Sequence, residues 1–118
     1  MLIEYFEPDY EFKDDRGMLV QLIHDGFKQV NVITCNKDSV RGGHYHKKNT
    51  EMFYVISGSF KLELKKDDIS EEYEIKAGTL FKVGPMISHT FNYTEDTVLV
   101  SAYSLGVEMP DGQKDIYK

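Results

Sequence analysis

The sequence has little cysteine and no long hydrophobic run. Its one cysteine, Cys35, excludes an internal disulfide, and the apolar run VNVITC around it predicts a small buried core residue without a chemical role. No segment approaches the length of a membrane-spanning helix, about 18 apolar residues. The start, MLIEYFEPDY, carries Glu4, Glu7 and Asp9 where a signal peptide would need a basic flank. We therefore expect a soluble, cytoplasmic protein with no membrane partner.

The sequence also lacks an excess of positive charge. It carries 14 Lys and Arg residues against 20 Asp and Glu residues, a formal net charge of −6. Proteins that bind nucleic acid usually present a basic stripe to the phosphates, so nucleic acid is not an expected partner. A length of 118 residues is enough for one hydrophobic core and too short for a second folded unit. We expect a single domain that spans residues 1–118.

Helical periodicity is absent, and the hydrophobic pattern instead repeats every second residue. In SFKLELK, Phe60, Leu62 and Leu64 share one face and lysine and glutamate share the other, which is typical of a strand with one wet side. Similar runs predict strands at 30–35, 52–57, 59–65, 71–76 and 97–103. Turn signals such as NKDS and KAG separate them at a spacing that predicts an all-β sandwich or barrel.

Half of the four histidines stand close together, at His44 and His46. In a strand, residues i and i+2 point to the same side, so these imidazoles would converge while Tyr45 points away. A turn at KKNT would return the chain to Glu51, and His89 is the strong candidate for a fourth ligand. Three imidazoles and a carboxylate, with no thiolate, suit zinc, iron(II), manganese, nickel or copper.

Two histidines at this spacing are by themselves a weak signal, and a lone histidine such as His24 is more often a surface or capping residue. The pair is followed by a glutamate, a glycine and a later Gly-Pro turn with a histidine, and this combination favours a metal site. Gly42 and Gly43 come just before the pair, where the missing Cβ would allow another backbone to approach closely.

These residues resemble the two motifs of the cupin superfamily. The first motif matches His44, His46, Glu51 and Gly58, and the second matches Gly78, Pro85, His89 and Asn92, although Gly-Pro-Met stands here in place of the usual Pro-x-Gly. The resemblance implies a single-domain antiparallel β-barrel, or jelly roll, which is often homodimeric. It also implies a divalent metal on His44, His46, Glu51 and His89.

A narrower resemblance covers nearly the whole chain. DDRGMLVQLI, FKQVNVITCNKDSVRGGHYH, TEMFYVISG and the end MPDGQKDIYK resemble the C-terminal cupin domain of capsular polysaccharide enzymes of the CapF type. DDRG and RGGHYHKK are also similar to the RmlC-like 3,5-epimerases and 3,4-ketoisomerases of nucleotide sugars. The resemblance implies C3 epimerisation of a nucleotide-linked 4-keto-6-deoxy sugar in surface polysaccharide biosynthesis. It further implies a bound zinc, with iron, manganese or nickel as alternatives, and a separate short-chain reductase that acts on the product.

The resemblance leaves two assignments of His44 open. In metal-free relatives its position is the catalytic base, whereas a histidine bonded to a metal cannot accept that proton. Either the metal is catalytic and another residue is the base, or the metal is structural or absent and His44 is the base. A tyrosine inside the barrel would be the acid, and we predict Tyr103, with Tyr54 and Tyr93 as alternatives.

Basic residues are expected to hold the diphosphate of the substrate. Arg16, Arg41 and Lys48 match basic positions of these families, and arginine offers a bidentate fork to phosphate oxygens. The alternatives are that Arg16 pairs with a neighbouring aspartate and that Lys48 is a solvated turn residue. The run VNVITC has no tyrosine, whereas the ketoisomerases carry tyrosines there, so epimerisation is favoured over ketoisomerisation.

Two other classes of function fit the same ligand set. Three histidines and one glutamate also serve iron- or copper-dependent dioxygenases among cupins, which act on small phenolic or thiol substrates. A barrel that binds a metal or a sugar without turnover is the third class. The epimerase hypothesis is preferred because its resemblance includes residues outside the metal motif.

Overall fold

The computed structural model describes residues 1–118, which form eleven strands and no helix. The strands are β1 (Ile3–Tyr5), β2 (Tyr10–Asp14), β3 (Gly17–Gln21), β4 (Gln29–Cys35), β5 (Val40–His44), β6 (Glu51–Ser57), β7 (Ser59–Lys66), β8 (Ile69–Lys76), β9 (Leu80–Val83), β10 (Ser88–Tyr93) and β11 (Thr97–Tyr103). The five strands predicted from the alternating pattern are confirmed, as β4, β6, β7, β8 and β11. No helix of the length and apolarity that a membrane crossing requires is present.

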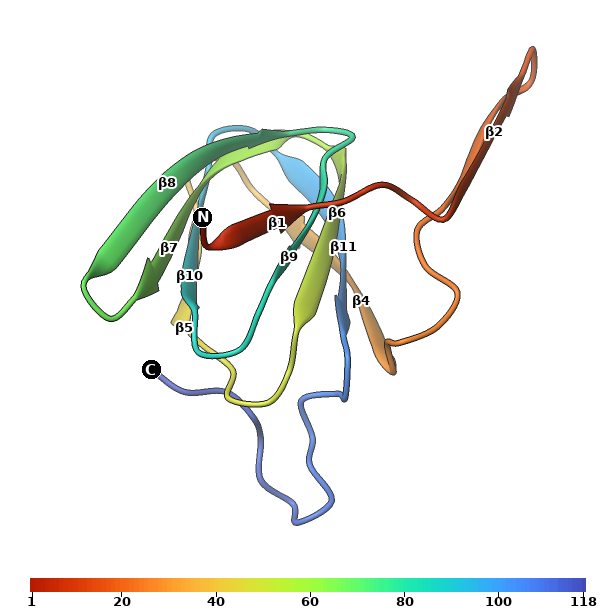
Figure 1. Cartoon of the computed structure of the whole chain (residues 1–118). Helices are drawn as coiled ribbons and strands as arrows, with labels where there is room; N and C mark the ends of the chain where they lie inside the picture. The colour runs from red at the N-terminus through yellow and green to blue at the C-terminus, as the bar shows by residue number, and fades with distance from the viewer.

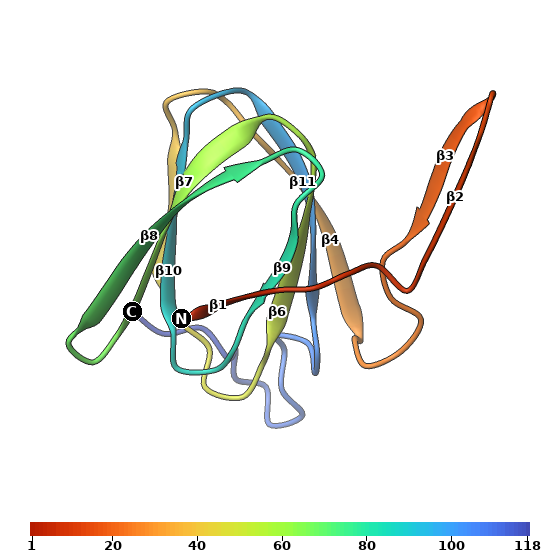
Figure 2. The ribbon, with the colours of Figure 1, turned by 45° about the horizontal axis from the view of Figure 1, so that its top comes forward.

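Two antiparallel sheets form the body of the molecule. One has the strand order β1-β9-β6-β11-β4 and the other the order β5-β10-β7-β8. Figures 1 and 2 show the two sheets curving around a common interior. The all-β antiparallel prediction is confirmed, and the arrangement is consistent with a cupin jelly roll. No strand pairing joins the two sheets, so they are not closed as a barrel.

The interior between the sheets is filled by aromatic and aliphatic side chains. The alternation in β7 buries Phe60, Leu62 and Leu64, as predicted. Phe53 and Phe81 stack from neighbouring strands, with their ring centroids 5.0 Å apart. Burial of such large apolar side chains is the main favourable contribution to folding, at about 25 cal/mol per Å². Cys35 belongs to the same core, which confirms that it is buried.

A third, two-stranded sheet lies outside this body. Strands β2 and β3 pair as a hairpin that projects away from the sheets in both views (Figures 1 and 2). Its apolar side chains Phe12, Met18 and Leu19 are exposed. β4 is an edge strand of the larger sheet, and its outward-facing Val30 and Val32 are 64% and 71% exposed. Such edges and apolar patches mark interaction surfaces.

The pairing of β5 with β10 depends on glycine. Gly42 lies opposite Thr90, next to a register shift between His89 and Thr90. A Cβ added to Gly42 would lie 2.4 Å from the carbonyl oxygen of His89, and its φ is +107°. The predicted close approach is therefore confirmed at Gly42. Gly43 has a φ of +74° but open space around it.

This difference gives a matched pair of variants. Gly43→Ala should lower the free energy of unfolding by about 1–2 kcal/mol, the cost of a positive φ. Gly42→Ala carries a similar backbone cost and must also displace β10, so we expect a further loss of about 1–3 kcal/mol. Urea denaturation of both variants measures this, and equal losses would contradict the close approach.

Candidate functional site

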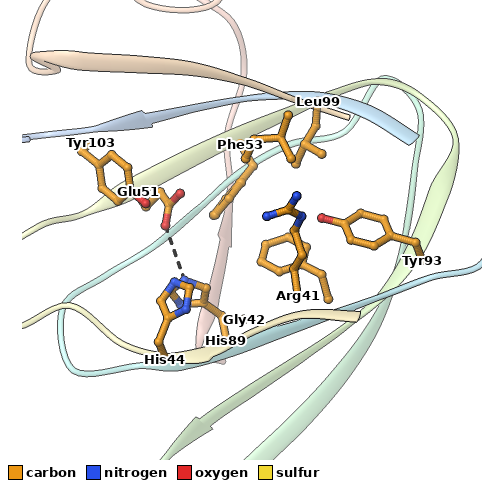
Figure 3. Close-up of a pocket in the computed structure, with 11 residues that line it drawn as sticks. Arg41, Gly42, His44, Glu51, Phe53, His89, Tyr93, Leu99 and Tyr103 are labelled. Carbon is orange, nitrogen blue, oxygen red and sulfur yellow. Dashed lines mark ion pairs between the residues drawn. The ribbon is translucent and has the colours of Figure 1, made fainter. Parts of the chain in front are cut away.

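A cavity of about 230 Å³ lies between the two sheets (Figure 3). Both sheets contribute to its walls. Its lining consists of polar side chains at two ends with apolar side chains between them: Ile33, Arg41, Gly42, His44, Glu51, Phe53, His89, Phe91, Tyr93, Leu99 and Tyr103.

The predicted ligand residues meet at one end of the cavity. His44 ends β5 and pairs with His89 of β10, so their rings lie 4.7 Å apart between centroids. His46 lies beyond the end of β5 and not inside the strand, yet its ring is 5.4 Å from that of His44. The ligand nitrogens of the three histidines all lie within 4.8 Å of one another. The convergence expected from alternating residues is therefore present.

Glu51 opens β6 and places its carboxylate between two of these imidazoles. Its Oε1 lies 3.1 Å from Nε2 of His46 and 3.4 Å from Nε2 of His89. Burial alone would raise the pKa of Glu51, but the contacts with both histidines outweigh it and lower the pKa below its ordinary value. Burial would likewise lower the pKa of His46, and its bonds to Glu51 and to the backbone at Asp115 instead raise it.

Backbone carbonyls orient these two imidazoles. His46 donates its Nδ1–H to the carbonyl oxygen of Asp115 at 2.6 Å, and His89 donates its Nδ1–H to that of Ile87 at 3.2 Å. Each ring therefore presents Nε2 to the Glu51 carboxylate. An unprotonated Nε2 facing a carboxylate oxygen needs a proton or a cation between them. The donor set thus fits a divalent metal of the zinc type, since metal-bound histidines usually donate their other N–H in this way.

His44 differs from the other two histidines. It is half-buried and lines the cavity, whereas His46 lies behind it. Burial, together with the nearby His89 and His46, lowers its pKa to about 4. At neutral pH its imidazole is therefore uncharged and able to accept a proton.

Two of the three candidate tyrosines face the cavity. The hydroxyl of Tyr103 points toward Glu51 and that of Tyr93 toward Arg41 (Figure 3). Burial raises the pKa of both, reinforced by Glu51 at Tyr103 and by the Cys35 thiol at Tyr93. Both hydroxyls therefore remain protonated at neutral pH. Tyr54 does not line the cavity and packs instead against a second, smaller apolar cluster of Met52, Leu80 and Ala102.

Arg41 marks the far end of the cavity. Its Nε donates to Sγ of Cys35 at 3.1 Å, and its guanidinium lies beside Tyr93 (Figure 3). Cys35, for which the sequence predicts no chemical role, thus helps to position the one arginine of the cavity lining. No local sequence signal indicates this contact, because the two residues lie on different sheets.

The other predicted basic residues lie away from the cavity. Arg16 sits in the turn of the projecting hairpin, where its guanidinium pairs with Asp14 at 2.6 Å and is 83% exposed. Lys48 is exposed in the turn between β5 and β6. His24 is also exposed and pairs with Asp9 at 2.6 Å, as expected of a surface histidine.

The fold and this site define a class: an all-β protein of two facing antiparallel sheets, with a cluster of histidines and a glutamate in the cavity between them. The family model described as "Polysaccharide biosynthesis C-terminal domain" matches residues 12–106. The chain belongs to this family, within the cupin superfamily that its motifs resemble. No curated protein matches the chain.

Several solved structures are similar to the chain. The 3,4-ketoisomerase QdtA of Thermoanaerobacterium thermosaccharolyticum, a double mutant in complex with TDP, is 30% identical with a TM-score of 0.69, covering 86% of this chain and 78% of that one. The TDP-quinovose 3,4-ketoisomerase WlaRB of Campylobacter jejuni has a TM-score of 0.80 at 17% identity, covering 96% and 92%. The capsular polysaccharide assembling protein CapF of Staphylococcus aureus is 23% identical with a TM-score of 0.68, covering 92% of this chain and 33% of that one.

The buried carboxylate generates a stability prediction. Glu51→Gln in metal-free protein should lower the free energy of unfolding by about 3 kcal/mol or more, because it removes one partner of a buried ion pair. Because the pKa of Glu51 is lowered on folding, its contribution to the free energy of unfolding is present above pH 4.5 and is lost as the pH falls below that value. Because the pKa of His46 is raised on folding, its contribution is present below pH 6.5 and is lost as the pH rises above that value. The loss should therefore be largest between these values.

Urea denaturation with EDTA present, at several pH values, measures this difference. Glu63→Gln is the matched control, since Glu63 pairs with Lys65 at 3.4 Å on the surface and should cost less than about 1 kcal/mol. If the two variants lose the same stability, the Glu51 carboxylate does not hold the cluster together.

Proposed function

We propose that the chain moves a proton next to the ketone of a nucleotide-linked 4-keto-6-deoxy sugar and so epimerises it at C3. The observation that carries the proposal is that one cavity is lined by the imidazole of His44 from one sheet and by the hydroxyl-bearing ring of Tyr103 from the other. A complex of QdtA, 27% identical, contains TDP-4-keto-6-deoxyglucose. Membership of the polysaccharide biosynthesis family supports the same class of substrate.

The reaction needs a base, an acid and stabilisation of an enolate. The base removes the proton from C3, and the electron pair of that C–H bond forms the C3–C4 double bond while negative charge moves to the oxygen on C4. Returning a proton to C3 from the opposite face restores the ketone with inverted configuration. The base and the acid must therefore stand on opposite sides of the sugar ring.

His44 and Tyr103 meet these requirements. His44 lies on β5 and Tyr103 on β11, which belong to the two facing sheets, so a sugar between the sheets would have one residue on each face. The lowered pKa of His44 keeps its imidazole uncharged at neutral pH, as a base must be before it takes the proton from C3. The raised pKa of Tyr103 keeps its hydroxyl protonated and able to return one.

We propose a divalent metal, zinc first, as the cofactor, held by His46, Glu51 and His89, with His44 beside them as either a fourth ligand or the base. When bound, such an ion supplies Lewis-acid stabilisation of an oxyanion. The anchored rings of His46 and His89, with Glu51 between them, supply three ligands, the usual number for a catalytic zinc. Both cavity tyrosines stay protonated, so His44 is the group best suited to act as base. This favours leaving His44 free over using it as a fourth ligand.

Arg41 is the group proposed to hold the diphosphate. Its planar guanidinium can bind two phosphate oxygens at once, and its place at the far end of the cavity would leave the sugar next to the histidines. A 3,4-ketoisomerase is the second candidate, favoured by the 30% identity to QdtA. It would begin with the same loss of the C3 proton and return a proton to C4.

Proton NMR of a nucleotide-linked 4-keto-6-deoxy sugar in heavy water tests the proposal. We expect the C3 proton signal to disappear with the wild-type protein and to be retained at least about 100-fold longer with His44→Ala, the usual contribution of a general base. His24→Ala is the matched control, since His24 is the exposed histidine, and it should behave as the wild type. Runs with EDTA and with added zinc measure the dependence on metal.

The product and the negative outcomes separate the candidates. A ketone that stays at C4 supports epimerisation, whereas a ketone at C3 establishes the ketoisomerase. If deuterium enters neither the uridine nor the deoxythymidine substrate with zinc present, the proposal fails. Oxygen uptake by the iron-loaded protein would then indicate a dioxygenase. Without oxygen uptake, the remaining hypothesis would be a barrel that binds a metal or a sugar without turnover.

We further propose that two copies associate through the hairpin of β2 and β3 and the outer face of β4. The exposed Met18 and Leu19 of the hairpin and the exposed Val30 and Val32 of the edge strand are apolar surfaces that a second copy would bury. The hairpin would carry Arg16 onto that copy, where its predicted contact with substrate would be made.

Sedimentation velocity at micromolar concentration tests this association. The wild-type protein should sediment as a dimer. Val32→Glu should weaken the dimer about tenfold or more, because it would bury an unpaired charge. Ile69→Glu, at an exposed apolar position on β8 of the other sheet, is the control. A wild-type monomer would remove the proposal.

A further inference from the structure

The chain after β11 returns to the functional site. We call residues 107–118 the C-terminal strap. Figure 1 shows the chain running from the end of β11 into this strap and on to the C-terminus, which lies near the end of β5. Tyr45 and Tyr117 exchange two backbone hydrogen bonds, of 2.8 and 3.0 Å, and their rings stack. The amide of Asp115 donates to the carbonyl oxygen of Val107 at 2.8 Å. The strap is therefore tied both to the first residue after β5 and to itself.

One side chain of the strap binds three consecutive backbone amides of the turn between His46 and Glu51. The carboxylate of Asp115 is buried and accepts the backbone N–H groups of Lys47, Lys48 and Asn49, at 2.9, 3.0 and 3.0 Å. It also accepts Nδ2 of Asn49 at 2.9 Å. Four donors on one carboxylate fix the path of this turn, since charge-assisted hydrogen bonds are roughly twice as strong as neutral ones.

The backbone of the same residue reaches the site directly. The carbonyl oxygen of Asp115 accepts the Nδ1–H of His46 at 2.6 Å. The corresponding partner of His89 is the carbonyl of Ile87, which lies two residues before it in the sequence. The orientation of His46 thus depends on a segment 69 residues away in sequence, whereas the orientation of His89 is set locally.

We propose that Asp115 is a positioning residue of the site: its carboxylate seats the turn so that its carbonyl oxygen holds His46 with Nδ1 protonated and Nε2 facing Glu51. This rests on the proposed function only for its effect on turnover. If the Asp115 carboxylate only anchored the C-terminal strap, its bonds to the turn amides would be sufficient. The bond from the His46 ring to the backbone carbonyl of Asp115 would then not depend on the carboxylate. The state of that ring therefore distinguishes positioning from anchoring.

Long-range proton–nitrogen NMR of the imidazole rings tests the proposal on metal-free, full-length protein, at a pH high enough that the ring signals no longer change with pH and a neutral tautomer is observed. In the wild type, His46 should show a protonated Nδ1. In Asp115→Ala the His46 ring should show a mixture of tautomers, while the His89 ring should stay unchanged. Asp111→Ala is the matched control, because the Asp111 carboxylate accepts only the N–H of Gln113, in the exposed part of the strap at residues 110–114.

The second readout is the zinc affinity and the rate of C3 deuterium exchange. Loss of a group that orients a metal-binding histidine typically lowers metal affinity or activity by about 10–100-fold. Zinc affinity and the rate of C3 deuterium exchange should fall by this factor in Asp115→Ala and be unchanged in Asp111→Ala. If Asp115→Ala does not fold, Asp115→Asn decides, since it keeps one acceptor oxygen and nearly the same volume.

Two results would overturn the proposal. One is a His46 ring that keeps its tautomer in the Asp115 variants, and the other is an equal disturbance of His46 and His89, which would indicate general loosening of the fold. A wild type that exchanges no deuterium would refute the proposed function alone, because the ring signals test the positioning without turnover.

Discussion

The buried carboxylate of Glu51 is the interaction on which the site depends. A carboxylate in an apolar interior is costly unless it is hydrogen-bonded and paired, and here the partners are Nε2 of His46 and of His89. Each of these rings is held at its other nitrogen by a backbone carbonyl. The starts of β6 and β10 and the C-terminal strap must therefore be in their native places at once for the charge to be satisfied.

The apolar wall of the cavity then sets the protonation states of the other groups. Burial disfavours the charged form of any side chain, so it lowers the pKa of His44 and raises that of Tyr103. Burial therefore keeps the His44 imidazole unprotonated on one sheet and the Tyr103 hydroxyl protonated on the other. Phe53 and Phe91, whose rings lie 6.2 and 6.0 Å from that of His89, form this wall beside the cluster.

The sequence predicts well those features that depend on residues close together in the chain, such as the alternation of buried and exposed residues in a strand. Strands such as β7 bury alternate residues, and His44, His46 and Glu51 come together because only a short turn separates the end of β5 from the start of β6. β5 was not recognised as a strand from its hydrophobic pattern, since two glycines interrupt it and most of it is exposed. Two sets of contacts carry no local signal. Arg41 and Cys35 are six residues apart but lie on different sheets, and Asp115 lies 66 to 69 residues from its partners in the turn after β5.

Within the proposed function, the placement of the proton-carrying groups favours epimerisation over isomerisation. Both reactions would share the enolate, and they differ in the atom that receives the returning proton. The side chains of β4 that face the interior are Gln29, Asn31, Ile33 and Cys35, and none is a tyrosine. The tyrosine hydroxyls of the cavity come from β10 and β11 instead, and Tyr103 lies on the sheet opposite His44. A donor that faces the base across the sugar ring suits return of the proton to the same carbon with inversion, whereas transfer to the neighbouring carbon needs no donor on the opposite face.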